Sequence, residues 1–383
     1  MTTTPTPTIF TAAPNITYQW IDSDVALADL CQSLSTQSAI ALDTEFVRTR
    51  TYYPHIGLLQ IADENGVYLI DPLAISDKQP MADVLQNPAI VKVVHACSED
   101  LEVFQYAFGV LPESLFDTQV AAGFAGYGAS IGYANLLREI KHIDIPKQET
   151  RSDWLQRPLS DAQLRYAALD VEYLLEIYRG LVEKLQQQQR LLWVESDCQG
   201  MIEKLRNTSH ENTYYTRVKS AWKLDAEQLT VLAAICRWRE GQAKKKDVPR
   251  SRILKDVSLF DIALKLPMDM QQLKRIQEIP SRFLEVLGKE FLDVVIDTLN
   301  DTGYYKEPLD RPLTSAQNTT LKSLKAEVRQ VAEDLDLPPE LLVRKKDYEA
   351  LIRSAPRYYL PESLSDWRQE IIGDRLLQKA QKL

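Results

Sequence analysis

The spacing of hydrophobic residues divides the chain into two parts at about residue 206. Before that point, short apolar runs typical of strands alternate with stretches whose apolar residues recur at helical spacing. After it, nearly all apolar residues follow the helical period. The pattern predicts a mixed α/β sheet with flanking helices, followed by an all-helical region. The predicted strands are 16–21, 39–47, 56–62, 67–70 and 91–95, and the predicted helices cover 23–34 and about 133–140 and begin near 98 and 160.

Local signals mark some of these elements. Asn65-Gly66, between two predicted strands, is a strong signal for a tight hairpin turn. The run 91–95 is almost wholly apolar, which is typical of a central strand covered on both faces. Ser160 and Gln163 have the spacing of a capping box, which predicts a helix start.

The helical region contains a diverged internal repeat. Residues 248–263 align without gaps on residues 337–352, with Pro249 on Pro338. A Pro-bearing stretch at 301–318 separates the two copies and is typical of a linker. Each copy is long enough to form a small helical bundle.

These divisions predict six segments along the chain. The Thr- and Pro-rich start has neither a basic beginning nor an apolar centre, so it is expected to be disordered and not a signal peptide. The segments are a disordered N-terminus (1–15), an α/β domain (16–206), a linker (207–219), a first helical domain (220–300), a second linker (301–318) and a second helical domain (319–383).

Composition restricts the possible functions. The formal net charge of −9 argues against a protein that coats duplex nucleic acid, although an enzyme that grips one strand end needs few phosphate contacts. No apolar run is long enough to cross a bilayer, so no membrane association is expected. The 4 cysteines are scattered without a C-x-x-C pair, which indicates reduced thiols in a cytoplasmic protein and neither disulfides nor zinc ligands.

Two acids lie near the end of one predicted strand. Asp43 and Glu45 follow an apolar run, and residues two apart in a strand point to the same face. Carboxylates that converge in this way repel each other and resist ionisation. Divalent cations with oxygen ligands would relieve the repulsion. The alternative is a strand end with two solvated acids, and further ligands are needed to decide between the two interpretations.

Two later segments supply candidate ligands. Asp100 falls in the first turn of a helix that Ser98 is expected to cap, directly after the 91–95 strand. Tyr166 and Asp170 are four apart in the helix that begins near 160, so they share one face. Taken singly, Tyr166 is also compatible with a core aromatic residue and Asp170 with a solvated charge.

The order Asp-x-Glu, Asp and Tyr-x-x-x-Asp resembles that of the DEDD exonuclease superfamily, in its tyrosine-bearing branch. The surrounding sequence is similar to the ribonuclease D family over about residues 16–206. The first helical copy resembles the HRDC domain, the second resembles it more loosely, and two such domains after the nuclease are the family's arrangement. The motifs are LDTEFVR (42–48), GLLQIA (57–62), HACSEDLEVF (95–104), FDTQVAA (116–122) and RSDWLQRPLS (151–160).

The resemblance implies a ribonuclease-H-like fold and a 3′–5′ exoribonuclease that hydrolyses phosphodiesters and releases nucleoside 5′-monophosphates. It also implies two divalent metal ions, Mg²⁺ or Mn²⁺, and a role for Tyr166 in orienting the attacking water. A tyrosine pKa near 10 favours orientation over deprotonation. The family's best-known substrates are tRNA precursors with 3′ extensions, alongside other structured RNAs, and no obligate protein partner is implied. The implied metal ligands are Asp43, Glu45, Asp100 and Asp170.

Further residues are candidates for substrate contact, each with a structural alternative. Phe46 follows the acids and either stacks on the terminal base or packs inward. His95, at a strand end, either contacts the terminal ribose or phosphate or is a satisfied structural histidine. The densest basic run either binds RNA phosphates or is a solvated face. It consists of Lys244, Lys245 and Lys246, with Arg250, Arg252 and Lys255 close by in the sequence.

Three functions from different classes are compatible with these features. The first is an exoribonuclease that trims 3′ ends of structured RNA. The second is a proofreading-type DNA exonuclease, which the pair of HRDC-like segments and the lack of a polymerase-sized region disfavour. The third is a non-enzymatic RNA-binding protein with a decayed nuclease domain, which the complete set of four acids and a tyrosine disfavours.

Overall fold

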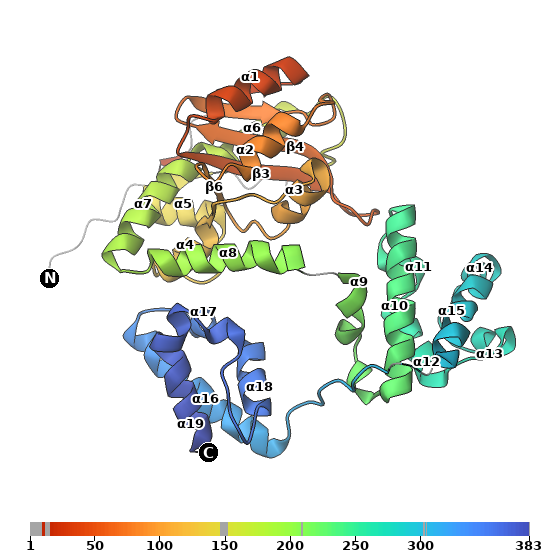
Figure 1. Cartoon of the computed structure of the whole chain (residues 1–383). Coiled ribbons are helices and arrows are strands. Elements are labelled where there is room, and N and C mark those ends of the chain that lie inside the picture. The colour runs from red at the N-terminus through yellow and green to blue at the C-terminus, as the bar shows by residue number, and fades with distance from the viewer. Residues whose placement is uncertain are drawn as a thin grey trace. The chain divides into compact units, whose positions relative to one another are not determined.

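The computed structural model describes residues 10–11, 16–145, 152–207, 210–301, 303 and 305–382. The chain, drawn in Figure 1 in colours that run from red at the N-terminus to blue at the C-terminus, divides into two units. The predicted disordered N-terminus, 1–15, lies outside the described residues except for 10–11. Unit 1 consists of Met1–Val47, His55–Arg206 and Leu313–Leu383, and unit 2 consists of Arg48–Pro54 and Asn207–Pro312.

The strands described in the structure all belong to unit 1. They are β1 (Phe10–Thr11), β2 (Gln19–Ile21), β3 (Ala39–Val47), β4 (His55–Asp63), β5 (Gly66–Ile70), β6 (Val91–Val94), β7 (Leu115–Asp117) and β8 (Ile143–Asp144). Six of them form one sheet in the order β2-β5-β4-β3-β6-β7. The pairs β3–β4 and β4–β5 are antiparallel and the other three are parallel, so the predicted mixed sheet is confirmed. β1 and β8 pair separately.

The centre of the sheet follows the sequence pattern closely. β3 spans the predicted 39–47, and its apolar run Ile40, Ala41 and Leu42 has no exposed surface. The predicted hairpin joins β4 to β5. The Asp63 carboxylate accepts hydrogen bonds from the backbone N–H groups of Asn65 at 2.8 Å and of Gly66 at 3.1 Å. Gly66 has φ +151°, a conformation that favours glycine.

Helices cover the sheet of unit 1. Ser23 caps α1, accepting a hydrogen bond from the Ala26 N–H, and the predicted capping box of Ser160 with Gln163 is present. The expected Ser98 cap is wrong, because α3 begins two residues later and no side chain caps it. The helices are α1 (Asp24–Leu34), α2 (Gln79–Gln86), α3 (Asp100–Phe108), α4 (Thr118–Phe124), α5 (Tyr133–Lys141), α6 (Asp161–Glu172), α7 (Leu174–Gln187) and α8 (Leu191–Asn207).

The C-terminal helices also belong to unit 1. They are α16 (Ser315–Asp334), α17 (Pro339–Leu342), α18 (Lys345–Arg353), η3 (Glu362–Leu364), η4 (Gln369–Gly373) and α19 (Asp374–Gln381). Trp367 stacks on Trp193 of α8 with ring centroids 4.4 Å apart. Arg368 binds Asp197 through two hydrogen bonds of 2.6 and 2.7 Å, and both side chains are nearly buried. A paired and doubly hydrogen-bonded buried charge fixes one relative placement of the two segments.

Unit 2 is a helical bundle that also includes the segment between β3 and β4. Its elements are α9 (His210–Thr213), η1 (Tyr214–Arg217), η2 (Ala221–Lys223), α10 (Ala226–Lys246), α11 (Arg250–Ile253), α12 (Asp256–Lys265), α13 (Met270–Lys274), α14 (Ser281–Val286) and α15 (Gly288–Asn300). The Tyr52 hydroxyl donates to the fully buried Glu240, whose charge pairs with Arg250. The Asp247 carboxylate accepts the N–H groups of Tyr52 and Tyr53 at 3.0 Å each. Segment 48–54 is therefore part of the unit 2 fold.

The internal repeat is present in the structure. The first residues of α16, α17 and α18 are the residues that align with the first residues of α10, α11 and α12, in that order. Both long helices start with a capping box, at Asp225 and at Thr314. Both are followed by an aspartate with positive φ, Asp247 at 46° and Asp336 at 52°. After the third helix the copies differ in the lengths of their elements: α15 has 13 residues, whereas α19, which packs on α16 as α15 packs on α10, has 8.

Two expectations drawn from composition concern cysteines and membranes. Cys31, Cys97, Cys198 and Cys236 are buried and form no disulfide, so the prediction of unpaired thiols is confirmed. In the part of the chain that the structure describes, every helix is too short or too polar to cross a membrane.

Candidate active site

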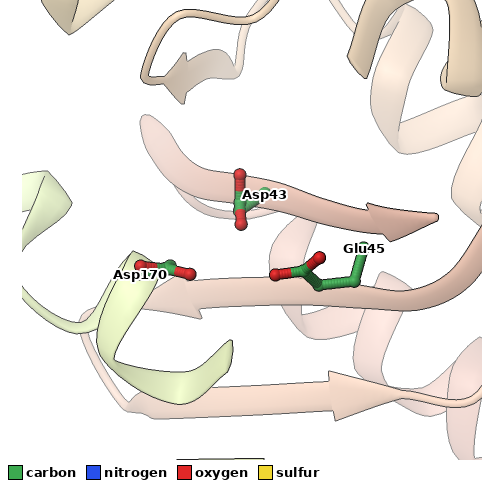
Figure 2. Close-up of side chains that lie close together, drawn as sticks. All are labelled: Asp43, Glu45 and Asp170. Carbon is green, nitrogen blue, oxygen red and sulfur yellow. The ribbon is translucent and has the colours of Figure 1, made fainter. Parts of the chain in front are cut away.

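Three carboxylates from two elements meet in unit 1. Asp43 and Glu45 project from β3, and Asp170 projects towards them from α6 (Figure 2). One oxygen from each carboxylate can be chosen so that all three lie within 4.8 Å of one another. The i and i+2 spacing on β3 therefore brings its acids to one face, and α6 adds a third acid to that face.

The placement of α6 follows from its sequence and packing. Its capping box fixes the first turn, and the helix packs against β3, β4 and β5. Tyr166 lies one turn before Asp170, and its hydroxyl donates a hydrogen bond to the Asp170 carboxylate. The structure thus brings together four of the five predicted residues of the catalytic set, including Asp43 and Glu45.

The fifth residue, Asp100, lies beside this cluster but is not one of the three converging carboxylates. It is buried in the first turn of α3, and its carboxylate accepts a hydrogen bond from the Thr44 hydroxyl. The turn before α3 is held by Asp117, which accepts the N–H groups of Ala96 at 3.0 Å and Cys97 at 2.9 Å. Ala96 has φ 59°, so these two hydrogen bonds stabilise a strained backbone next to the site.

Burial and mutual repulsion keep protons on these acids. Burial raises the pKa of Asp43 well above its usual range, and the nearby charges of the other acids raise it further. Burial, then the charges of Asp170 and Asp100, raises the pKa of Glu45 to about 9. Burial also raises the pKa of Asp170 to about 7 and that of Asp100 to about 6. Without a compensating cation, the cluster cannot carry its full negative charge at neutral pH.

The residues fit divalent cations. Hard cations such as Mg²⁺ take carboxylate and carbonyl oxygens as ligands, and this cluster offers only such atoms. Gln60 faces Asp43 across the β3–β4 pair and has no exposed surface. Its carboxamide has no hydrogen-bond partner among the described residues, so it adds a polar group beside the acids.

The two predicted substrate residues near the cluster have different surroundings. Phe46 follows Glu45 at a register shift in the β3–β4 pair, is partly exposed and packs against the core. One ring nitrogen of His95 lies 2.9 Å from Thr118 Oγ1, and the other lies 3.1 Å from the Ile131 carbonyl oxygen. These contacts favour the structural interpretation of His95, and substrate contact by either residue stays a prediction.

The predicted basic run forms the last turn of α10 in unit 2. Lys245 and Lys246 are exposed, whereas Lys244 is partly buried with its ammonium 5.9 Å from the centroid of the Tyr52 ring. Of the neighbouring cations, Arg250 pairs with Glu240 inside the unit. Lysines in the last turn also complement the helix dipole, so the structure leaves both interpretations of the run in place.

Sequence reasoning missed two residues that shape the cluster. The Tyr133 hydroxyl donates to the Leu169 carbonyl at 3.1 Å, one residue before Asp170. Burial and the nearby charges of Asp170 and Asp43 raise the pKa of Tyr133, so it remains a donor. Thr44 lies between the two β3 acids and binds the Asp100 carboxylate. Neither residue has a sequence signal, because a tyrosine and a threonine in these settings read as ordinary packing.

Family models define the class of protein. A model described as "3'-5' exonuclease" matches residues 18–186, a range that contains all four acids and Tyr166. A model described as "HRDC domain" matches residues 228–295, which lie in unit 2. Together with the mixed sheet, these matches define a 3′–5′ exonuclease domain joined to a helical HRDC region.

Whole-chain comparisons narrow the class to one family. Ribonuclease D of Pseudomonas paraeruginosa is 42% identical over 373 residues, which cover 96% of this chain and 98% of the relative. Ribonuclease D of Haemophilus influenzae is 34% identical over 369 residues, with 94% and 92% covered. The crystal structure of Escherichia coli RNase D superimposes with a TM-score of 0.88 at 34% identity, covering 96% of this chain and 99% of that chain.

The chain belongs to the ribonuclease D family. It is a 3′–5′ exoribonuclease, so the predicted family, fold class and activity are confirmed. The HRDC model covers the first of the two predicted helical domains, and the second stays a prediction.

The raised pKa values predict that the ion effect on stability depends on pH. In divalent-free buffer, Glu45 and Asp170 have folded pKa values of about 9 and about 7, above their usual range. Their contribution to stability is therefore full below about pH 4 and is lost as pH rises through the folded values. Saturating Mg²⁺ should raise the melting temperature little at roughly pH 5 and increasingly towards roughly pH 8, because protons and ions compete.

Asp43→Asn is the matched variant for this measurement. Asn has nearly the same size and cannot ionise, so it removes the free-energy cost of keeping a proton on Asp43 in the folded state. It should therefore raise the melting temperature of the divalent-free protein near neutral pH and reduce the shift caused by Mg²⁺. Thermal melts with and without the ion, across the pH series, give both quantities. The account of a metal site built on these acids would be contradicted if Mg²⁺ shifted the melting temperature by the same amount at every pH. It would also be contradicted if the shift in Asp43→Asn equalled that of the unaltered protein.

Proposed function

We propose that this exoribonuclease hydrolyses the 3′-terminal phosphodiester of structured RNA, including tRNA precursors with 3′ extensions, at the cluster formed by Asp43, Glu45 and Asp170. The observation that carries the proposal is the convergence of three carboxylates within 4.8 Å at raised pKa. The structured-RNA substrate is supported by the relative from Escherichia coli, described as an exoribonuclease involved in structured RNA processing. The cytoplasmic location of this exoribonuclease stays a prediction.

Asp43, Glu45 and Asp170, with Asp100 beside them, would hold two divalent ions, Mg²⁺ or Mn²⁺. Bound there, the ions supply charge stabilisation for the attacking and leaving oxygens. The chain's own part is to present carboxylate oxygens from β3 and α6 as ligands. The Thr44 hydroxyl donates a hydrogen bond to the Asp100 carboxylate, which restricts the orientation of that carboxylate.

Tyr166 would orient the attacking water. Burial and the charges of the surrounding acids raise the pKa of Tyr166 above its usual value, so its hydroxyl stays protonated at neutral pH. A protonated phenol donates and accepts hydrogen bonds but does not remove a proton from water. Its position one turn before Asp170 on α6 is the arrangement expected for the tyrosine-bearing branch of the superfamily.

The helical segments would bind substrate and take no part in the chemistry. The offset shared by α10–α12 and α16–α18, with the matching capping boxes, supports a second HRDC-like domain in the C-terminal segment. The second copy has Glu333 and Asp334 where the first has Lys244 and Lys245. RNA contact through this helix end is therefore proposed for the first copy alone.

Loss of one ligand should abolish hydrolysis and leave the fold intact. Asp43→Ala removes a carboxylate from the cluster, and because the ions contribute several kcal/mol to the transition state, the rate should fall at least roughly 10³-fold. The measurement is release of nucleoside 5′-monophosphates from a 3′-extended tRNA with Mg²⁺ or Mn²⁺. Circular dichroism checks that the variant folds.

Asp29→Ala is the control, because Asp29 is an exposed acid on α1. It should retain the rate of the unaltered enzyme. A DNA strand of the same sequence forms a second arm and should be cut more slowly than the RNA. Near-normal activity of Asp43→Ala, or hydrolysis that persists in excess EDTA, would refute the metal-dependent reaction at this cluster.

The exposed lysines at the end of α10 give a prediction about RNA binding. Replacing Lys245 and Lys246 with Gln leaves Lys244 and its contact with Tyr52 unchanged. If each lysine binds a phosphate, the negative slope of log K against log[salt] for a tRNA precursor should become shallower by roughly 0.7–0.9 per lysine replaced. Cleavage at saturating substrate should be nearly unchanged.

The charge-matched control replaces Lys274 and Lys289 with Gln, two exposed lysines elsewhere in unit 2. It should leave both the affinity and the slope as they are. Binding titrations over a salt series compare the three proteins. Parallel slopes and equal affinities for all three would mean that the run is a solvated face.

A further inference from the structure

We propose that Arg157 is a positioning residue for Tyr166. Its side chain ties the segment in front of α6 to the sheet, and so fixes where the tyrosine hydroxyl lies relative to Asp43 and Glu45. Arg157 can act in this way only if Tyr166 has the catalytic role proposed above.

The Arg157 guanidinium makes five hydrogen bonds inside unit 1. Nε donates to Asp71 Oδ2 at 2.7 Å and Nη2 to Asp71 Oδ1 at 2.6 Å, the bidentate geometry that makes such pairs strong. Nη2 also donates to the Gly57 carbonyl at 2.6 Å. Nη1 donates to the carbonyls of Trp154 and Gln156 at 2.9 Å each. One side chain therefore joins β4, the chain after β5 and the segment that leads into α6.

The segment meets β4 at Gly57. A Cβ atom on this residue would lie 2.4 Å from the Trp154 carbonyl oxygen and 2.8 Å from Trp154 Cβ, so the close approach requires glycine. The Trp154 side chain is 2% exposed, and its ring centroid lies 6.3 Å from that of Tyr166 at 37°. Arg157 thus holds the backbone of Trp154, and the ring of Trp154 packs beside Tyr166.

The partner of Arg157 is itself fixed. The Asp71 N–H donates to the Ile21 carbonyl at 2.9 Å, and the Asp71 carboxylate accepts the Leu73 N–H at 3.0 Å. Burial alone would raise the pKa of Asp71, but the hydrogen bonds from Arg157 and Leu73 outweigh it and hold the pKa below its usual value. Asp71 therefore stays ionised at neutral pH, and the pair with Arg157 persists.

The strand to which Arg157 binds is the neighbour of the catalytic strand. Gly57 precedes Leu58, and Leu58 pairs with Glu45 across β3 and β4. The anchor thus lies beside one of the acids that Tyr166 faces. Misplacing a catalytic group by about 1 Å can cost roughly 10²-fold in rate, so a loosened Trp154 segment would slow the reaction through Tyr166.

A double-mutant cycle on kcat tests this coupling. Arg157→Ala, Tyr166→Phe and the double variant are assayed on a single-stranded RNA with saturating Mg²⁺. Tyr166→Phe should lower kcat by roughly 10²-fold or more, the scale of a group that acts on the attacking water. Arg157→Ala should lower kcat roughly 10- to 100-fold in the wild-type background and less than about 3-fold in the Tyr166→Phe background. KM for the RNA should change less than about 3-fold in each.

Arg206→Ala is the matched control, because Arg206 forms an exposed ion pair with Glu113 at 3.3 Å in the same unit. It should leave kcat unchanged in both backgrounds. Equal losses from Arg157→Ala in the two backgrounds would overturn the positioning role and leave the proposed function intact. Unchanged kcat in Tyr166→Phe would instead refute the catalytic role of the tyrosine, and the positioning role with it.

Two milder variants keep the test decisive if Arg157→Ala does not fold. Arg157→Lys keeps the positive charge but cannot form the bidentate pair with Asp71. Asp71→Asn keeps the shape of the partner and removes its negative charge. Either should lower kcat in the wild-type background and not in the Tyr166→Phe background, and circular dichroism checks that each variant is folded at the assay temperature. Wild-type kcat in both variants would also overturn the positioning role.

Discussion

The repulsion among Asp43, Glu45 and Asp170 is the constraint on which the rest of the site depends. Folding brings these carboxylates together at raised pKa, so the apoprotein keeps protons on them and loses stability as they ionise. Packing elsewhere in unit 1 offsets this loss of stability. The strand β3 is paired on both sides, and α6 is capped and packs against three strands. A frame that tolerates this repulsion is already shaped for the cations that remove it.

Charge has different uses in the two units. In unit 1, acids converge and form no ion pair with a cation among the described residues, which leaves them available to metal ions. In unit 2, the cation Arg250 and the acid Glu240 are paired in the interior with the Tyr52 hydroxyl, so they stabilise the bundle and are not available to RNA. The exposed Lys245 and Lys246 remain for phosphate contact. The overall negative charge is thus compatible with RNA binding, because what matters is where the unpaired charges lie.

Sequence reasoning succeeded where the signal is local. The full span of β3, the hairpin after it and the capping box of α6 follow from periodicity and turn chemistry, and the resemblance supplied the candidate acids. It failed where a contact joins distant segments. Nothing in the sequence pairs Arg157 with Asp71, or Thr44 with Asp100, because such contacts exist only once the sheet has formed. The membership of segment 48–54 in unit 2 has the same origin.

The central claim is that the β3 acids and Asp170 form the metal site of the exoribonuclease. Anomalous diffraction from crystals grown with Mn²⁺ and a nucleoside 5′-monophosphate tests it most directly. The account predicts two manganese peaks roughly 3.5–4 Å apart, with Asp43, Glu45 and Asp170 among the ligands. Manganese bound elsewhere in an active enzyme, with these carboxylates free of it, would contradict the account.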